Sequence, residues 1–395
     1  MNLSQRVTSV GASATIAVTT RAKQMQAEGI DVISFGAGEP DFDTPKFIKD
    51  AAKGALDDGD TKYTPSSAAA LKRAVANKLL QENHLHVGAD QVVLTFGAKN
   101  AIYNACQALI DPGEKVLIPA PYWTSYPEMV KLAGGEPLIL PASRESGFKI
   151  TPRQVLDAAG GAKILILNSP GNPTGITYSP QELEEIAKAV LKTDLIIFSD
   201  EIYEKLVYGD TRFVSFAALD DALPERTVTF NGLSKAFSMT GWRLGWAAGP
   251  KDVIDAISRL MSHATTNPVS FAEAGALAAY EDPRAAAAIE AMRREFEQRG
   301  RGMAARLNAI DGVQCIEPTG AFYCFPDVSA HYGRQIGGVN VTDSLGFARV
   351  ALEAANVALV PGAAFGEDSC VRLSFATTMG HIHEGLDRLE KLLKQ

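Results

Sequence analysis

Short runs of apolar, often β-branched residues alternate along the first 250 or so residues with longer segments of helical periodicity. These runs occupy residues 92–95, 115–118, 162–167, 195–198, 227–230 and 244–248. Runs of this length without polar alternation are typical of strands that are buried on both faces of a parallel sheet. The pattern therefore predicts an α/β fold in which helices flank a mostly parallel central sheet, with one helix ending near Leu109 and another spanning about residues 180–191.

The pattern changes after about Tyr280. Pro283 begins a long segment rich in Ala, Arg and Glu that has helical periodicity to about Ala309. Shorter strands are predicted at residues 313–317, 322–325, 357–360 and 371–375, and a last helix at about 381–393. We therefore predict a large α/β domain formed by residues 46–282 and a smaller α+β domain formed by residues 1–45 and 283–395.

Composition and charge narrow the classes of function. The chain has 395 residues and a net charge of −8, so neither nucleic acid nor an anionic membrane is attracted by bulk charge, and an anionic ligand needs a local site. The four cysteines form no CxxC pair, which favours buried thiols over a zinc site or a disulfide framework. The N-terminus lacks the apolar core of a signal peptide and no run is long enough to span a membrane, so we expect a cytoplasmic protein.

Lys235 lies in the most informative segment of the chain, Gly232-Leu233-Ser234-Lys235, which directly follows a predicted strand. A free lysine is protonated at neutral pH, whereas a lysine held in a covalent imine can be released to move a proton at the neighbouring carbon. An ordinary surface lysine is the alternative, but that alternative does not explain the loop of small residues around Lys235. Arg243 follows eight residues later, and its planar guanidinium suits a phosphate better than a surface salt bridge.

Polar residues follow two other predicted strands. Asp200 comes directly after one of them and can pair with a protonated pyridine nitrogen, although a carboxylate there is often only a helix N-cap. Tyr203, three residues later, can turn back toward a ring hydroxyl. Asn172 stands between prolines and glycines in a stiff loop that can present its amide to a phenolate oxygen. Taken alone, the Asn-Pro dipeptide favours a plain turn.

Three further positions suit a planar anionic ligand. Gly97, Ala98 and Lys99 follow a strand and begin a helix, where exposed backbone N–H groups favour an anion. Trp123 follows another strand and can stack on a planar ring or simply fill the core. Arg372 lies inside an apolar strand, where its charge requires either a substrate carboxylate or a structural ion pair.

Together these segments resemble the class I pyridoxal-phosphate aminotransferases of fold type I, and most closely the bacterial aspartate aminotransferases. The resemblance covers nearly the whole chain, from Ser13-Ala14-Thr15 through Gly36-Ala37-Gly38-Glu39-Pro40-Asp41-Phe42 to the strand of Arg372. It implies pyridoxal 5′-phosphate as the cofactor, amino acids and 2-oxo acids as the substrates, and a homodimer with shared active sites.

The resemblance also implies a role for each matching residue. Lys235 matches the Schiff-base lysine, Asp200 the partner of the pyridine nitrogen, and Trp123 the stacking ring. The remaining cofactor-binding positions are Gly97, Ala98, Lys99, Asn172, Tyr203, Ser234 and Arg243, together with Tyr63, which matches a tyrosine that reaches the phosphate in the neighbouring subunit. Arg372 matches the clamp for the α-carboxylate, with support from Gly38, and Trp123 and Asn172 also border the substrate.

Two positions depart from the family's pattern. Gly232 stands where many relatives have a phosphate-binding serine, and Ser66-Ser67-Ala68-Ala69-Ala70 replaces a glycine-containing turn after Tyr63. The second segment is one residue shorter than its counterpart. The resemblance therefore leaves the course of the chain after Tyr63 open.

The choice of substrate rests on Lys99 and Thr15, because residues of these types at these positions accompany dicarboxylic substrates in the resembling subgroup, and prephenate in some members. The resemblance thus implies transamination between L-aspartate and 2-oxoglutarate, with glutamate and prephenate as further substrates. The alternatives are an aminotransferase for aromatic or neutral amino acids, a β-lyase on the same scaffold, and a binding protein without catalysis. No metal is implied.

Overall fold

The computed structural model describes residues 2–63 and 65–394, without the side chains of residues 65–67. Its centre is a seven-stranded sheet in the order β2-β8-β7-β6-β5-β3-β4. The strands are β2 (Val92–Thr95), β3 (Lys115–Ala120), β4 (Glu136–Pro141), β5 (Ala162–Asn168), β6 (Ile196–Asp200), β7 (Thr227–Gly232) and β8 (Gly245–Ala248). Strands β7, β6, β5, β3 and β4 are parallel, and β8 is antiparallel to both of its neighbours. The predicted mostly parallel sheet is therefore confirmed.

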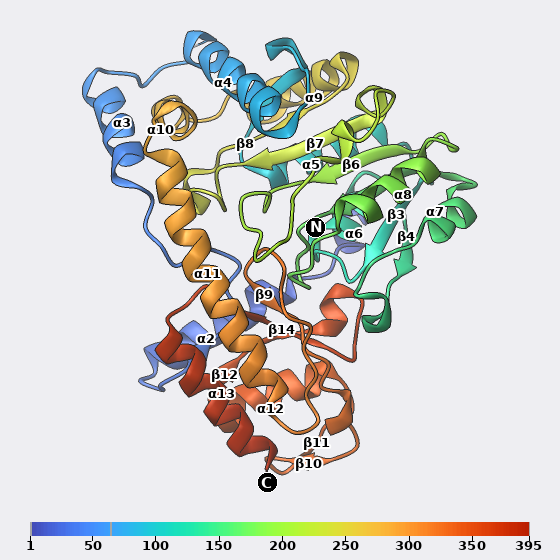
Figure 1. Cartoon of the computed structure of the whole chain (residues 1–395), viewed down its shortest axis with the longest axis vertical. Helices are drawn as coiled ribbons and strands as arrows, with labels where there is room; N and C mark the ends of the chain where they lie inside the picture. The colour runs from blue at the N-terminus through green and yellow to red at the C-terminus, as the bar shows by residue number, and fades with distance from the viewer. Residues whose placement is uncertain (1, 64, 395) are drawn as a thin grey trace.

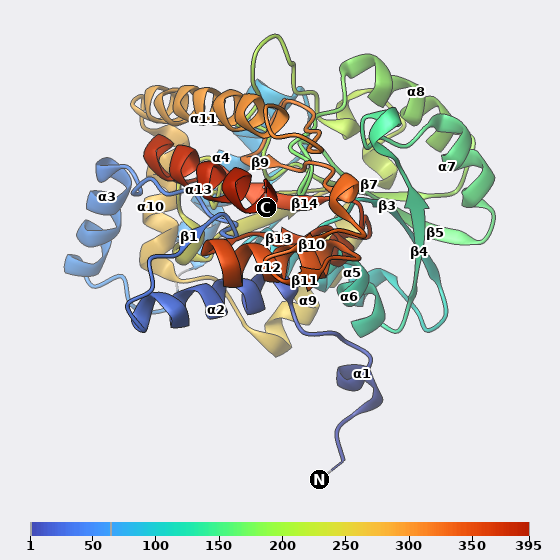
Figure 2. The same ribbon diagram turned by 90° about the horizontal axis from the view of Figure 1, so that it is seen from below.

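Helices cover both faces of this sheet, as Figures 1 and 2 show. In β3, Val116 and Ile118 pack toward the helices at residues 98–109, 125–132 and 251–264, whereas Leu117 packs toward those at residues 152–159 and 180–190. Neighbouring side chains of a strand point to opposite faces, so a strand covered on both sides must be apolar throughout. Each fully buried side chain of this kind contributes about 1.5–3 kcal/mol through the removal of apolar surface from water.

The helices that flank the sheet begin at local sequence signals. They are α3 (Lys46–Asp57), α4 (Pro65–Asn83), α5 (Ala98–Leu109), α6 (Ser125–Leu132), α7 (Pro152–Ala159), α8 (Pro180–Val190), α9 (Lys251–Ala264) and α10 (Ser270–Glu281). Thr151 caps α7 and Ser179 caps α8, each in a reciprocal capping box with a proline in the first turn. The predicted end of one helix at Leu109 and the start of another at Pro180 are confirmed.

A second layered part lies at one end of the molecule, where α11 extends from the sheet region past α12 and α13 (Figure 1). Its helices are α2 (Ala14–Ala27), α11 (Ala285–Asn308), α12 (Ser344–Ala355) and α13 (Met379–Leu393). Its strands are β1 (Ile33–Ser34), β9 (Tyr323–Cys324), β10 (Gln335–Ile336), β11 (Val339–Asn340), β12 (Val357–Ala358), β13 (Val360–Pro361) and β14 (Val371–Ser374). Strand β1 pairs with β12, which brings the N-terminal segment onto this part. The short helix α1 (Gln5–Thr8) projects from the body in Figure 2.

Some predicted elements differ from the structure. Residues 313–317 form no named strand, because pairing is limited to one antiparallel bridge between Gln314 and Asp327. The backbone of the next residue, Cys315, instead exchanges two hydrogen bonds with the side chain of Asn308. The predicted strand 357–360 is divided at Leu359 into β12 and β13, which belong to different sheets. Strand β4 was not predicted. The segment Ser66–Ala70, whose course the sequence left open, lies in the first turns of α4.

Two expectations from composition can be compared with the structure. All four cysteines, Cys106, Cys315, Cys324 and Cys370, are buried. Within residues 2–63 and 65–394, none of the helices combines the length and the apolar character that a membrane crossing requires.

Candidate active site

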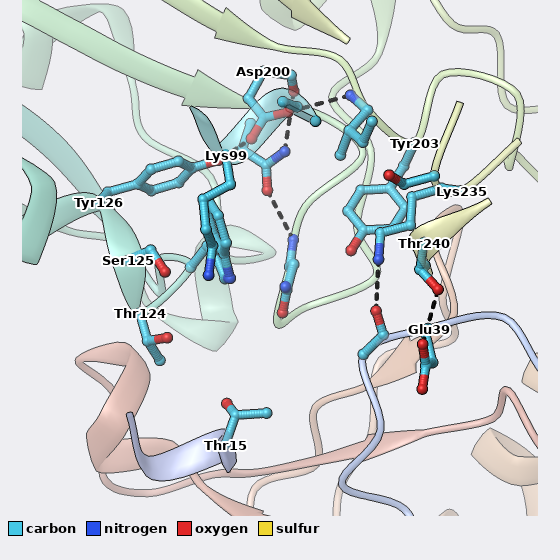
Figure 3. Close-up of a pocket in the computed structure, with 18 of the residues that line it drawn as sticks. Thr15, Glu39, Lys99, Thr124, Ser125, Tyr126, Asp200, Tyr203, Lys235 and Thr240 are labelled. Atoms are coloured by element: carbon cyan, nitrogen blue, oxygen red, sulfur yellow. Dashed lines mark hydrogen bonds between the residues drawn. The ribbon is translucent and has the colours of Figure 1, made fainter. Parts of the chain in front are cut away.

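A cavity of about 390 Å³ opens at the carboxyl ends of the central strands, where the loops after β5, β6 and β7 meet the N-terminal segment and β14 (Figure 3). Ligands of open α/β sheets bind at this edge. Almost every residue proposed from the sequence lines the cavity, namely Thr15, Gly38, Gly97, Ala98, Lys99, Trp123, Asn172, Asp200, Tyr203, Ser234, Lys235, Arg243 and Arg372. The exception is Tyr63, which lines a different cavity.

Lys235 extends from the loop after β7 into this cavity, beside Tyr203 (Figure 3). Its Nζ donates a hydrogen bond of 2.6 Å to the carbonyl oxygen of Gly38, and it lies 6.0 Å from the centre of the Tyr203 ring. Burial lowers the pKa of Lys235 to about 8, with a smaller contribution from the charges of Arg372 and Arg243. A lysine with this pKa is neutral often enough near physiological pH to act as a nucleophile or a base.

Asp200 ends β6 and is 4% exposed. The hydroxyl of Tyr126 donates to its Oδ2 at 2.5 Å, and the backbone N–H of Ile202 donates to its Oδ1 at 3.2 Å. Burial raises the pKa of Asp200 to about 6 despite these donors. The helix N-cap alternative does not apply, because turns and not a helix follow β6. A buried carboxylate of this kind is strongly stabilised by a cationic ligand group.

Arg372 lies across the cavity on β14 and is 2% exposed. Its NH1 donates to Oδ1 of Asn172 at 3.0 Å and its NH2 donates to the carbonyl oxygen of Gly36 at 2.9 Å, while its buried Nε has no partner among the described residues. Both partners are neutral, so the structural ion pair considered from the sequence is not formed within the described part of the chain. Because Oδ1 of Asn172 accepts from Arg372, the donors of its amide group are directed elsewhere.

The start of α5 forms a separate cradle at the floor of the cavity. Gly97 precedes Ala98 with a φ of +83°, and no side chain caps the helix there. The backbone N–H groups of a helix start are unsatisfied without a cap and attract an anion. Arg243 lies beside them, since its NH2 donates to the carbonyl oxygen of Phe96 at 3.0 Å and its NH1 to that of Thr240 at 2.8 Å.

Two glycines bring this cradle onto the β7–β8 hairpin. Gly232 pairs with Gly245, and a Cβ built on Gly232 would lie 2.7 Å from the Cα of Gly245. A Cβ built on Gly245 would in turn lie 2.4 Å from the backbone nitrogen of Ala98. The departure at Gly232 thus has a steric reason, because the backbone occupies the space that a side chain would need.

We expect Gly232→Ser to destabilise the protein rather than to add a phosphate ligand. Overpacking against backbone costs about 1–3 kcal/mol of unfolding free energy. Urea denaturation measures this loss, and Gly241→Ser in the same loop is the matched control, because no atom lies within 4 Å of its added Cβ. Equal stability of the two variants would contradict the steric explanation.

The cavity is also lined by Thr15 and Lys99, the two residues that the resemblance linked to the choice of substrate. Thr15 lies in the first turn of α2, and Lys99 lies in the first turn of α5. The Nζ of Lys99 is 4.9 Å from the centre of the Trp123 ring, and burial followed by the charge of Arg243 lowers its pKa. Lys99 and Thr15 therefore approach the same opening from the two parts of the molecule (Figure 3).

A family model described as aminotransferase class I and II matches residues 30–389. The chain belongs to this family. It is therefore an aminotransferase, and the resemblance inferred from its motifs is confirmed.

This aminotransferase is similar over its full length to proteins of known name. It is 44% identical to an aspartate aminotransferase from Bacillus subtilis, with 100% of both chains covered. It is 45% identical to an aspartate/prephenate aminotransferase from Cereibacter sphaeroides, with 98% of each chain covered. Among solved structures, the aspartate aminotransferase from Rhizobium meliloti superposes with a TM-score of 0.95 at 37% identity, covering 100% of this chain and 99% of that one.

The aminotransferase site also contains residues that were not predicted. They are Tyr126 and Tyr323, which contact Asp200 and Tyr203, and the cavity-lining Ser13, Glu39, Thr124, Ser125 and Thr240. Tyr126 follows Trp123 by one helical turn and packs edge-on against it at 5.2 Å, so its spacing was a usable signal. Nothing in the sequence around Tyr323 indicates that it reaches the site.

Tyr63 does not take part in the site within this chain. Its side chain is 78% exposed and lines a cavity together with Lys72, Thr266 and Asn267. Its proposed role concerns the phosphate site of a second subunit and stays a prediction.

Proposed function

We propose that this aminotransferase uses pyridoxal 5′-phosphate to exchange the amino group of L-aspartate with 2-oxoglutarate, giving oxaloacetate and L-glutamate. The observation that carries the proposal is the pairing of Lys235 with Arg372 in one cavity. Lys235 has an amine of lowered pKa, and Arg372 has a buried Nε without a partner in the described chain. One group suits proton transfer, and the other suits a carboxylate bound nearby.

The residues present fit pyridoxal phosphate in three respects. Asp200 is a buried carboxylate with a raised pKa, which a protonated pyridine nitrogen stabilises. The uncapped start of α5 beside Arg243 offers N–H groups and a cation to a phosphate. Trp123 and Tyr203 line the same cavity and offer an aromatic face and a hydroxyl to a planar ring with a hydroxyl group. When bound, the cofactor supplies an aldehyde carbon for the amino group and a ring that accepts electrons from the substrate.

Each residue of the site is then assigned a role. Arg372, supported by the backbone of Gly38, binds the α-carboxylate, and the Nζ of Lys235 takes the proton from the substrate's Cα. Asp200 keeps a proton on the ring nitrogen, while Tyr203 and Asn172 donate hydrogen bonds to the ring oxygen. Gly97, Ala98, Lys99, Ser234 and Arg243 form the phosphate side of the site, and Trp123 covers the ring.

Lys99 and Thr15 are proposed to receive the second carboxylate of the substrate. The names of the relatives from Bacillus subtilis and Cereibacter sphaeroides support aspartate, and the second also supports prephenate. We further propose that the protein is a cytoplasmic homodimer in which Tyr63 reaches the partner's phosphate site. We also propose that residues 46–282 form one domain and residues 1–45 with 283–395 the other.

The proposed function is tested by mixing the purified, cofactor-loaded protein with aspartate alone. One equivalent of oxaloacetate per site is expected, together with a change of the visible absorption band, and 2-oxoglutarate should restore that band. A substrate panel of aspartate, glutamate, prephenate, phenylalanine and alanine separates the proposal from an aromatic or neutral aminotransferase. Release of pyruvate from a β-substituted alanine would instead indicate a β-lyase, and absence of any reaction would indicate a binding protein.

Replacing Lys99 by alanine should impair dicarboxylic substrates selectively. Loss of a charged hydrogen-bond donor costs about 1.5–3 kcal/mol, so kcat/KM for aspartate should fall about 10- to 100-fold while that for alanine changes little. Steady-state kinetics with both amino acids measure the difference.

Arg372→Ala is the matched comparison, because loss of the α-carboxylate clamp should weaken both substrates by about 100-fold or more. Lys99→Arg keeps the charge and should retain the preference for aspartate. Equal losses for aspartate and alanine in the Lys99→Ala variant would refute its role in specificity.

A further inference from the structure

A second cavity, of about 490 Å³, lies outside the proposed active site in a groove between α2 and α12, which lie beside each other in Figure 2. None of its lining residues borders the proposed active site. Its volume is within the usual range of small-molecule sites, about 300–1,000 Å³. The residues that line this α2–α12 groove include no lysine, cysteine or histidine. The groove therefore suits the binding of a ligand rather than a second reaction.

One wall of the α2–α12 groove is aliphatic. It is formed by Val18 of α2, by Leu345, Ala348 and Leu352 of α12, and by Leu359. The buried side chains of α12 face the core, whereas Leu345 is 65% exposed. A single exposed leucine is ordinary, but one that lines a cavity with other aliphatic side chains gives an apolar group a surface from which to displace water. This wall favours a ligand with an aliphatic part.

Two arginines, Arg21 and Arg349, reach the groove from its two helices. Val18 and Leu352 pack on one small cluster of buried side chains. Each arginine lies three residues from one of these two, which is about one turn along the same helix face. Neither guanidinium has a hydrogen bond or an ion pair within residues 2–63 and 65–394. Two such groups at the edge of one apolar contact favour a carboxylate.

The groove also carries two carboxylates. Asp343 is engaged in capping α12, because it accepts from the backbone N–H of Gly346 at 2.7 Å and from the hydroxyl of Thr342 at 3.2 Å. Glu353 follows Arg349 by one helical turn and has no hydrogen bond or ion pair among the described residues. A phosphate would be repelled by Glu353, whereas a ligand that carries an ammonium group beside its carboxylate would be attracted.

We propose that the α2–α12 groove binds a free α-amino acid with an aliphatic side chain. Arg21 and Arg349 receive its carboxylate, Glu353 faces its ammonium group, and its side chain lies on the aliphatic wall. The inference does not depend on pyridoxal phosphate or on the proposed reaction. Because α2 also carries Thr15 to the active-site cavity, this ligand would contact a helix that the two sites share.

The test is calorimetric titration of the cofactor-loaded protein with L-leucine, after borohydride reduction has blocked amino-group exchange at the cofactor. One site per chain is expected, with a Kd of about 1 mM or below. Isoamylamine is leucine without the carboxylate and should not bind measurably. The analogue 4-methylpentanoate lacks only the ammonium group and should bind about 2- to 5-fold more weakly than L-leucine. Absence of L-leucine binding, or equal binding of isoamylamine, would overturn the inference.

Variants of the groove locate the binding. Arg349→Ala should weaken L-leucine about 5- to 10-fold, and the double variant with Arg21→Ala should bind none measurably. Ala17→Phe keeps both arginines but fills the groove from an exposed position of α2, so it should also abolish binding. Arg259→Ala is the matched control, because Arg259 is exposed on α9 and does not line the groove. Unchanged affinity in the double variant and in Ala17→Phe would refute the site.

Two other outcomes would also overturn the inference. L-leucine bound in the active site would be lost in Arg372→Ala and kept in Arg349→Ala, the reverse of the expected result. A change in the oligomeric state of the double variant in size-exclusion chromatography would show that a second copy of the chain covers the groove. Failure of the half-reaction with aspartate would refute the proposed function but would leave L-leucine binding unaffected, so the two failures can be distinguished.

Discussion

Replacing Lys235 by alanine is expected to reduce the half-reaction with aspartate by about 10⁴-fold or more, because under the proposed function the variant loses both the group that attaches to the cofactor and the base at the substrate's Cα. Stopped-flow spectroscopy of the cofactor-loaded variant measures this rate. Borohydride should fix the cofactor covalently to the wild-type protein and leave the variant unlabelled, as mass spectrometry of the intact chain would show.

Lys235→Arg is the informative companion variant. It keeps a cation near the carbonyl oxygen of Gly38 but cannot act as a neutral amine at physiological pH. Both variants should therefore fold and bind the phosphate while remaining inactive. Recovery of more than a few percent of the wild-type rate in either of them would show that another group moves the proton.

The second large effect is expected from Asp200→Asn, which should lower the half-reaction rate about 1000-fold, because an amide cannot stabilise the protonated ring nitrogen. Asp200→Glu keeps the charge and should retain more activity. A loss confined to cofactor affinity, with a normal rate at saturating cofactor, would contradict this role.

Although Asp200→Asn should lower the rate, it should raise the free energy of unfolding of the cofactor-free protein above pH 6. The pKa of Asp200 is raised from 3.8 to about 6, so the carboxyl group favours the folded state below pH 4, and this contribution is lost as pH rises through 6. Asparagine carries no charge, so above pH 6 the variant avoids the cost of burying an ionised carboxylate. After subtraction of the one hydrogen bond that is lost, its free energy of unfolding should be higher by about 1–2 kcal/mol. Urea denaturation at pH 4 and pH 8 should show this gain only at the higher pH.

Much of this architecture could be predicted because its signals are local. A strand such as β5 is apolar throughout, and Ser179 with Glu182 marks the start of α8 within four residues. Where such a strand ends in a parallel sheet, the next residues must lie at the binding edge, so Asp200 and Lys235 could be placed together. The roles of the individual residues came from the resemblance to a family.

What could not be predicted depends on partners distant in the sequence. Cys315 bonds to the side chain of Asn308, and the strand that residues 313–317 favour is reduced to one bridge, between Gln314 and Asp327. Tyr323 meets Tyr203 only because β9 pairs with β14. The proposed role of Tyr63 concerns a second subunit, so the fold of this chain does not test it.

The two parts of the molecule contribute different contacts to the cavity. Lys235 and Arg243 leave the same hairpin, so chain connectivity fixes the lysine relative to the phosphate cradle. Arg372, Gly38 and Thr15, in contrast, come from segments that assemble around α11, β14 and the N-terminal residues. A chimaera that takes residues 1–45 and 283–395 from another aminotransferase would therefore receive a new clamp for the α-carboxylate but keep its own Lys235, Asp200 and phosphate cradle, so carboxylate recognition can be exchanged without replacing these groups.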